Sequence, residues 1–339
     1  MIRRAGWLLA AGAFLAACSV QHRETDPMPT LPSLTEETPL PPPPPEIAAP
    51  PSPAPAPAPT PAPAPTPVPA APPRAAEAPR PAKPRIWGRV AITTDVISPS
   101  QLMGPALPYV AGYKRLPVFP EKLTFDVSWG LLSVGEATLG VDKIVMFNGR
   151  PAYHIVSEAR SNSFCDTFYP VRDLNESWLD ARTLTSLGYS KKLREGHYYR
   201  DVWVLYDRDA GTFVERQTSK DGSFQVKTGT IPAQVQDILS SVYYTRSQPL
   251  PDGGQVIVDV NTPDNWPLVV QVKKRGIIQV PLGRFPSVLV EPAMRREGLF
   301  IQKGKRLQLW LSDDPSRRAL MMKVEVFFGH ITAVLREMV

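Results

Sequence analysis

Histidine and cysteine are scarce in this chain of 339 residues, which contains four histidines and two cysteines. No two histidines stand at the spacing of metal ligands. The chain also lacks the G-x-S-x-G elbow, the P-loop, the G-x-G-x-x-G fingerprint and the H-E-x-x-H motif. His154 lies in an alternating segment, which predicts a surface or hydrogen-bonded role. We therefore expect no enzyme activity, no bound metal and no cofactor.

The N-terminus has the pattern of a cleaved bacterial export signal. Arg3 and Arg4 precede an apolar run over residues 7–17, which is too short to span a bilayer as a helix. The run closes with Leu-Ala-Ala-Cys, which resembles the lipobox of bacterial lipoproteins. We predict a signal peptide over residues 1–17 and acylation of Cys18, with palmitate as the label that would detect it. An ordinary signal peptide that happens to contain a cysteine is the alternative.

Acylation would make a membrane the first partner of this protein. Each buried methylene contributes about 0.8 kcal/mol, so two or three acyl chains anchor a protein stably without a spanning helix. In bacterial lipoproteins the residue after the cysteine directs sorting, and Ser19 in place of aspartate favours the outer membrane. We predict an outer-membrane lipoprotein on the periplasmic face, with surface exposure as an alternative. That compartment excludes nucleic acid as a partner, although the formal net charge is +6.

A proline-rich tether follows the mature N-terminus of residues 18–26. Residues 27–84 contain 25 of the 41 prolines, with alanine between many of them. Proline lacks the amide donor that helices and sheets require, and the stretch has little apolar surface to bury. We predict a disordered linker with polyproline II character, and its reach approaches about 180 Å at about 3.1 Å per residue. A ligand for a proline-recognising partner is the alternative.

The rest of the chain alternates apolar and polar residues with the period of β-strands. Examples are Leu123 to Trp129, Val256 to Val260 and Leu320 to Phe328. One segment, residues 235–244, has helical spacing instead. We predict a mainly β fold at residues 119–339: a single strongly curved antiparallel sheet of ten to twelve strands, an open half-barrel, with one short helix. Residues 85–118 are an extended segment of uncertain order.

The strand period also nominates a ligand face. Side chains two residues apart point to the same side of a strand, so large apolar side chains gather on one face. We predict that the helical segment covers this face, either filling it or leaving room for a ligand. The candidate residues are Phe125, Val127, Trp129, Leu309, Leu311, Val324, Val326 and Phe328.

Other side chains give weaker signals. Cys165 lies in the apolar stretch NSFCDTFY and is predicted to be a buried, unpaired thiol, because acylation of Cys18 leaves it no partner. Basic residues cluster at 191–200, 273–275 and 303–306. They are predicted to be solvated strand faces, with anionic lipid headgroups, lipopolysaccharide or peptidoglycan as alternative partners.

Several stretches together resemble one family of bacterial envelope proteins. They include LTFDVSWGLLSVGEATLGV, FYPVRDLNESWLDARTL, KKLREGHYYRD and DILSSVYYTRSQPL, and they run in order from about Leu123 to Leu335. They resemble domain of unknown function 3108, which brings no catalytic residues. The resemblance implies a fold similar to the LolA/LolB lipoprotein carriers, a curved half-barrel with an apolar concave face.

Two functions follow as expectations. The first is a non-enzymatic binding module for a lipid or other envelope amphiphile. The second is a structural or assembly factor that docks on an envelope protein or on the cell wall through its β domain. A hydrolase with an unrecognised site is a third alternative. The sequence does not identify the ligand, the protein partner or the oligomeric state.

Overall fold

A computed structural model of the chain describes residues 92, 98–262, 264–294, 306–326 and 329–339. All of the described residues belong to one compact unit. The predicted signal peptide, Cys18, Ser19, the tether and Phe328 lie outside the described residues.

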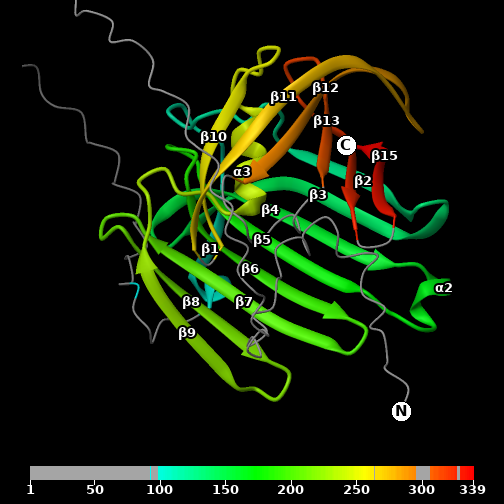
Figure 1. Ribbon diagram of the computed structural model, residues 1–339. Coiled ribbons are helices and arrows are strands. Elements are labelled where there is room, and N and C mark those ends of the chain that lie inside the picture. The colour runs from blue at the N-terminus through cyan, green and yellow to red at the C-terminus, as the bar shows by residue number, and fades with distance from the viewer. Residues whose placement is uncertain (1–91, 93–97, 263, 295–305, 327–328) are drawn as a thin grey trace, which may run out of the picture. The chain divides into compact units, whose positions relative to one another are not determined.

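The described residues form fifteen strands and three short helices (Figure 1). The first strands are β1 (Met103–Leu107), β2 (Glu121–Trp129), β3 (Leu132–Phe147), β4 (Arg150–Ser161), β5 (Arg172–Asp180), β6 (Ser186–Glu195), β7 (Tyr198–Asp207), β8 (Thr212–Ser219) and β9 (Phe224–Thr230). The others are β10 (Gln255–Asn261), β11 (Asn265–Val280), β12 (Gly283–Met294), β13 (Leu307–Ser312), β14 (Ala319–Glu325) and β15 (His330–Met338). The helices are α1 (Pro99–Leu102), α2 (Ser163–Asp166) and α3 (Ile238–Arg246).

The strands form one antiparallel sheet built from two meanders. Its order is β10-β11-β12-β13-β14-β15-β2-β3-β4-β5-β6-β7-β8-β9, and β1 pairs with the end of β3. The two meanders join because the last strand, β15, pairs with β2 and places Leu335 beside Phe125. The predicted mainly β fold with a single open sheet is confirmed. Fifteen strands replace the expected ten to twelve, and β3 and β11 run for 16 residues each.

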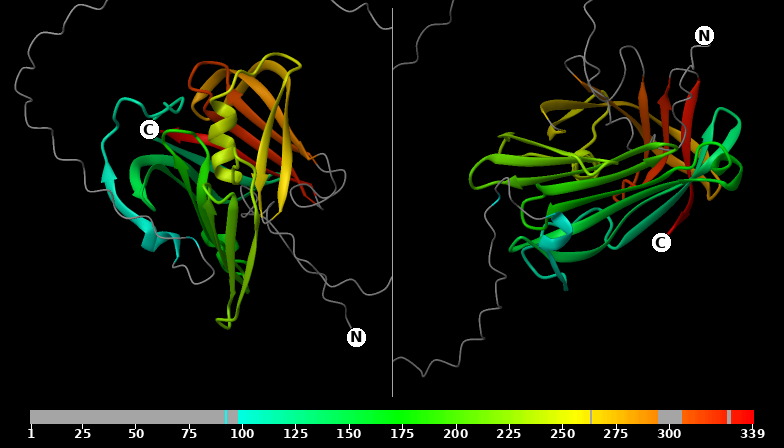
Figure 2. Two further views of the ribbon diagram at one scale, coloured as in Figure 1. Left: turned by 90° about the vertical axis from the view of Figure 1, so that its left-hand side faces the viewer. Right: turned by 90° about the horizontal axis from the view of Figure 1, so that it is seen from below.

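The sheet curls but does not close between β9 and β10. These strands are the two ends of the sheet order in the described part of the chain. Strand β9 instead contacts the β10–β11 turn and the start of β11: Asn265 Nδ2 donates to the Thr230 carbonyl at 2.8 Å, and Lys227 Nζ lies 2.7 Å from Asp264 Oδ1. Helix α3 belongs to the connection between the two strands. It lies at the boundary between the green strands and the yellow-to-red strands (Figure 2, left).

Helix α3 begins where its sequence provides a cap. Asp237 accepts hydrogen bonds from the backbone amides of Leu239 and Ser240, at 2.9 and 3.1 Å, and the Ser240 hydroxyl in turn accepts from the Asp237 amide. This capping box satisfies amide donors that a helix start leaves without partners. The helix predicted within residues 235–244 is therefore present. Two four-residue helices, α1 and α2, accompany it.

The alternation of each strand divides the sheet into two faces. We call the face that packs against α3 the inner face, and the opposite face the outer face. The inner face holds the main core, to which the inward residues of β2, β3, β4 and β10–β15 contribute together with Leu239 and Tyr243 of α3. On the outer face, α1 and β1 cover a smaller cluster around Trp178. The described part of the segment of uncertain order, residues 85–118, thus contributes strand β1 to the sheet.

Candidate functional site: the inner face of the sheet

Seven of the eight predicted ligand-face residues are described, and the structure places them along the inner face. Phe125, Val127, Leu311 and Val324 are buried, and Trp129, Leu309 and Val326 are half-buried. Strand pairing joins them, since Phe125 lies opposite Leu335, Val127 opposite Ala333, and both Trp129 and Val324 opposite Ile331. We call the residues Leu123, Phe125, Val127, Leu139, Leu311 and Leu335 the apolar half of the inner face.

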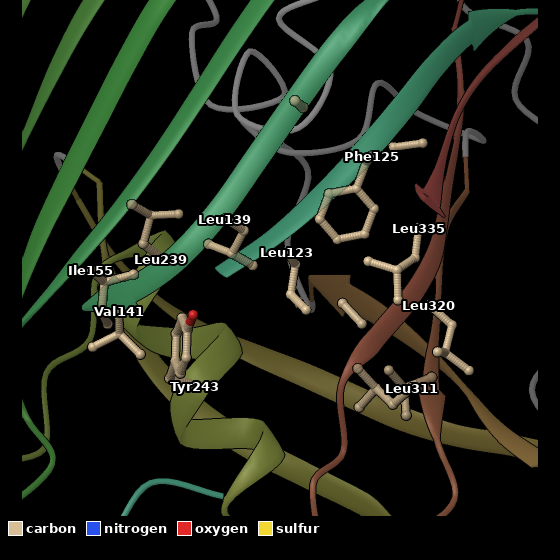
Figure 3. Close-up of a cluster of buried hydrophobic side chains, with 14 of the residues drawn as sticks. Leu123, Phe125, Leu139, Val141, Ile155, Leu239, Tyr243, Leu311, Leu320 and Leu335 are labelled. Carbon is tan, nitrogen blue, oxygen red and sulfur yellow. The ribbon is translucent and has the colours of Figure 1, made fainter. Parts of the chain in front are cut away.

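Helix α3 fills one end of this face. Leu239 and Tyr243 project from the helix toward Leu139, Val141 and Ile155 (Figure 3). Farther along β2 from that contact, Trp129 is only half-buried, as are Leu309 on β13 and Val326 after β14. The helix therefore covers the part of the inner face around Leu139, Val141 and Ile155. The far end of the face, near Trp129, keeps partly exposed apolar side chains.

Two buried polar contacts fix α3 to the sheet. At its N-terminus, the Asp237 carboxylate accepts from the hydroxyls of Ser177 on β5 and Ser186 on β6, at 2.7 and 2.6 Å. At its C-terminus, Arg246 donates two hydrogen bonds to Glu121, at 2.7 and 2.8 Å, and both side chains are fully buried. Burial raises the pKa of Asp237, and the hydroxyl and amide donors partly offset that rise. These contacts make α3 a fixed part of the core.

Next to α3, the inner face turns polar along one cross-strand row. Leu139 lies opposite Ser157, Ser157 opposite Asn175, and Asn175 opposite Lys191. Because directly opposite residues share a face, their side chains are neighbours, with Cβ atoms about 4.5–5.5 Å apart. We call Ser157, Asn175 and Lys191 the polar row. It continues the apolar half across β4, β5 and β6.

The polar row is buried, yet the side chains of Ser157 and Asn175 have no hydrogen-bond partner within the described part of the chain. Ser157 is 0% exposed, Asn175 2% and Lys191 9%. Within the described residues, neither the Ser157 hydroxyl nor either atom of the Asn175 amide has a hydrogen-bond partner. Lys191 forms no ion pair there, and its ammonium lies 5.3 Å from the ring centroid of Tyr189. Buried polar groups in folded proteins are nearly always paired, so each exception calls for a water, an ion or a ligand.

A carboxyl pair lies beside the polar row on the same face. Asp173 is two residues from Asn175 on β5, and Glu195 ends β6. Burial, followed by repulsion from Asp173, raises the pKa of Glu195 to about 8, and burial also raises the pKa of Asp173. Near neutral pH Glu195 therefore keeps its proton and can donate it toward Asp173. We call Asp173 and Glu195 the carboxyl pair; with the polar row and Glu215 they form the polar half.

The outer face carries a separate polar contact around His154. His154 Nε2 lies 3.0 Å from Glu176 Oε1, and its ring stacks on Trp178 at a centroid distance of 5.6 Å. The hydrogen bond to His154 is the main cause that lowers the pKa of Glu176. The expected hydrogen-bonded role of His154 is confirmed, and it lies on the face opposite the polar row.

The described residues bear on three further points: metal-binding groups, the Cys165 thiol and membrane-spanning helices. Among these residues, no group of three or more His, Cys, Asp or Glu side chains could hold a metal ion. Cys165 is a buried free thiol, and burial raises its pKa. No described helix has the length and apolar character needed to cross a membrane.

Sequence reasoning missed the polar row. Lys191 was expected among solvated basic residues, but it is buried on the inner face while its neighbour Lys192 is exposed. Ser157 continues the inward period of Tyr153 and Ile155, so its position could have been found from the alternation. A serine at an inward position gives no sign of whether it has a partner, and that required the structure.

One end of the sheet also exposes large apolar side chains. Leu131 in the β2–β3 turn is fully exposed, and Phe164 in α2 and Phe168 just after it are more than half exposed. The two connections are neighbours, because Asn162 donates through its backbone and side chain to the carbonyls of Val134 and Ser133. Phe164 and Phe168 form an edge-to-face pair. Such a cluster is a candidate contact surface.

The described residues define a class of fold: a curled antiparallel sheet around one helix, with an inner face that passes from apolar to polar side chains. The family model described as "Protein of unknown function (DUF3108)" matches residues 124–336, from β2 through β15. The chain belongs to this family, as the sequence motifs predicted.

The chain also matches solved structures at low sequence identity. A crystal structure of a beta-barrel-like protein of domain of unknown function DUF1849 from Brucella abortus has 11% identity and a TM-score of 0.46, covering 66% of this chain and 99% of the other. A protein from Bacteroides fragilis, described as exported and of YmcC-like fold, has 8% identity and a TM-score of 0.31, covering 68% and 100%. No curated protein matches the sequence significantly.

Proposed function

We propose that this protein is an envelope lipoprotein whose inner face binds a lipid or another amphiphile without catalysis. One observation carries the proposal: a continuous face of the sheet passes from the apolar half into buried polar groups that have no partner among the described residues. An amphiphile has the same division into an apolar and a polar part. A fold like that of the LolA/LolB carriers, which the family resemblance implies, would suit the same function.

The energetics of such a site are adequate. Transfer of apolar surface from water contributes about 25 cal/mol per Å², so burying one acyl chain contributes several kcal/mol. After the cost of association, micromolar affinity is the expected scale. Trp129, Leu309 and Val326, the half-buried residues at the far end of the face, would provide this apolar surface.

Binding can be measured on the unacylated chain from residue 19 to 339 with a hydrophobic fluorophore. We expect saturable binding by the wild type. Val326→Trp should weaken it at least tenfold, because the larger ring occupies the partly open end of the inner face. Lys323→Trp is the matched control, since it places the same ring on the same strand segment but on the outer face. Equal binding by both variants, or none by the wild type, would refute a ligand on this face.

The anchoring part of the proposal rests on Cys18 and Ser19. Labelled palmitate should enter the wild type and not Cys18→Ala. Fractionation should recover the wild type with outer-membrane markers, and Ser19→Asp should move part of it to the inner membrane. Label retained in Cys18→Ala, or wild type found wholly in the inner membrane, would contradict the anchoring or the sorting.

A second candidate function is docking onto an envelope protein or the cell wall. The exposed cluster of Leu131, Phe164 and Phe168 favours it. A photo-crosslinking amino acid at Leu131 should then capture one specific partner in cells, whereas the same group at Lys323 should not. A ligand on the inner face and a partner at this end of the sheet are compatible, so the two tests are independent.

A further inference from the structure

The polar row has the chemistry of a headgroup site, and its meaning rests on the proposed amphiphile binding. We infer that Ser157, Asn175 and Lys191 recognise an amphiphile whose acyl chain is attached through an amide and followed by a single negative charge. The inference depends on the order of these side chains, on their burial and on the partners they lack.

The order of the row follows from the strand register. Reading across the sheet, Leu123 pairs with Leu139, Leu139 with Ser157, Ser157 with Asn175, and Asn175 with Lys191. A single row therefore passes from two leucines to a hydroxyl, an amide and an ammonium group. Because Leu239 and Tyr243 of α3 already pack on Leu139, a ligand bound beyond the helix would meet the hydroxyl, the amide and the ammonium group in that sequence.

The missing partners indicate which groups the ligand carries. The Asn175 amide offers both a donor and an acceptor, and neither has a partner within the described chain. A ligand amide satisfies both with its own carbonyl and N–H, and the Ser157 hydroxyl can pair with the same group. Lys191 forms no ion pair within the described residues. A carboxylate or phosphate of the ligand would therefore be an ion-pair partner for its ammonium group.

The surroundings limit the negative charge of the ligand. The carboxyl pair lies two residues along β5 from Asn175, and Glu215 interacts electrostatically with Lys191. These acids would repel a headgroup with several negative charges, whereas one charge is matched by Lys191. The neighbouring position toward α3, Ser177, is already occupied by its hydrogen bond to Asp237. The polar row thus contains the first inward positions beyond Ser177 that do not hydrogen-bond to the α3 cap.

The test compares three probes that share one acyl chain. N-palmitoylglycine has both the amide and the carboxylate, palmitate has only the carboxylate, and N-palmitoylethanolamine has only the amide. Displacement of a hydrophobic fluorophore from the chain 19–339 gives their affinities. We expect N-palmitoylglycine to bind about tenfold more tightly than either of the others, since one charge-assisted or well-formed hydrogen bond accounts for about that factor.

Variants assign each preference to a residue. Lys191→Met should remove the advantage of the carboxylate and leave the affinity for N-palmitoylethanolamine unchanged. Asn175→Leu should remove the advantage of the amide and leave palmitate unchanged. Lys192→Met is the matched control, because it removes the same charge from the adjacent, exposed position on the outer face. Thermal unfolding should confirm that all three variants remain folded.

The outcomes separate this inference from the proposed function. If the wild type binds all three probes equally, the row contains only buried water and the headgroup assignment is wrong, although amphiphile binding stands. If Lys191→Met weakens all three probes alike, its role is structural and the assignment is also wrong. If neither the fluorophore nor any probe binds, both the assignment and the proposed function fail.

Discussion

The two halves of the inner face belong to the same sheet and meet at neighbouring strands. They differ in whether their buried side chains find the packing or hydrogen-bond partners that they need. In the apolar half, Phe125, Leu139 and Leu335 are completely buried in one continuous core. In the polar half, Ser157 and Asn175 are just as buried but have unmatched hydrogen-bonding groups within the described residues. Close packing stabilises the first half, whereas an unpaired buried polar group costs about 1–3 kcal/mol. The comparison indicates that close packing accounts for the first half, whereas packing alone does not account for the buried polar groups of the second.

The largest expected effect on stability comes from a substitution in the apolar half. Phe125→Ala should lower the free energy of unfolding by about 3–5 kcal/mol, because it removes a buried ring and leaves a cavity. Lys122→Ala, at an exposed position of the same strand, should change it by less than about 0.5 kcal/mol. Urea unfolding measures both. Similar effects from the two variants would show that Phe125 is not part of a closely packed core.

The next effect concerns the attachment of α3. Arg246→Met leaves the buried Glu121 carboxylate without its main partner and should cost about 3 kcal/mol, the lower end for a broken buried pair. Arg318 Nε, 3.6 Å from Glu121 Oε1, moderates the loss. The control is Arg336→Met, whose partners Asp126 and Glu136 are exposed, and it should cost less than about 1 kcal/mol. Equal losses in chemical unfolding would contradict a buried clamp.

The polar half should make stability depend on pH. Glu195 holds its proton in the folded state up to a pKa of about 8, whereas its ordinary value is 4.5. The folded state thus binds more protons between these values, so stability falls as pH rises. One extra proton corresponds to a loss of about 2 kcal/mol between pH 5.5 and 7. Glu195→Gln should flatten this slope, and an unchanged slope would show that Glu195 does not keep its proton in the folded state.

The smallest effect has the opposite sign. Ser157→Ala removes a buried hydroxyl that has no partner in the described chain, so it should leave stability unchanged or raise it by about 1 kcal/mol. It should also weaken binding of an amide-containing amphiphile. Thermal and urea unfolding measure the first change, and fluorophore displacement the second. A loss of more than about 1 kcal/mol would mean that Ser157 is satisfied by a bound water that maintains the fold.

The same comparison shows how far the sequence could lead. Alternation of large apolar residues predicted β2 and β14, and the helical spacing near residue 239 predicted α3. Hydrophobic period is a local property, so it can be read from a short window. The polar row is set by the register of three strands, and its burial is set by the residues that pack over it. Neither can be read from a short window of sequence. Lys191 and Lys192 are neighbours of the same type, and only the pleat of the folded strand distinguishes the buried one from the exposed one.

The pairing of β15 with β2 has a consequence for how the chain acquires its structure. Asp126 and Arg336 contact each other at 2.7 Å although 210 positions separate them in the sequence. The ladder between these strands can form only after residues 330–338 have been synthesised, and contacts this distant slow folding because a long loop must first be closed. A chain that folds late remains extended for longer after synthesis. If this protein crosses a membrane through a narrow channel, as its N-terminus predicts, that delay keeps it competent for transport.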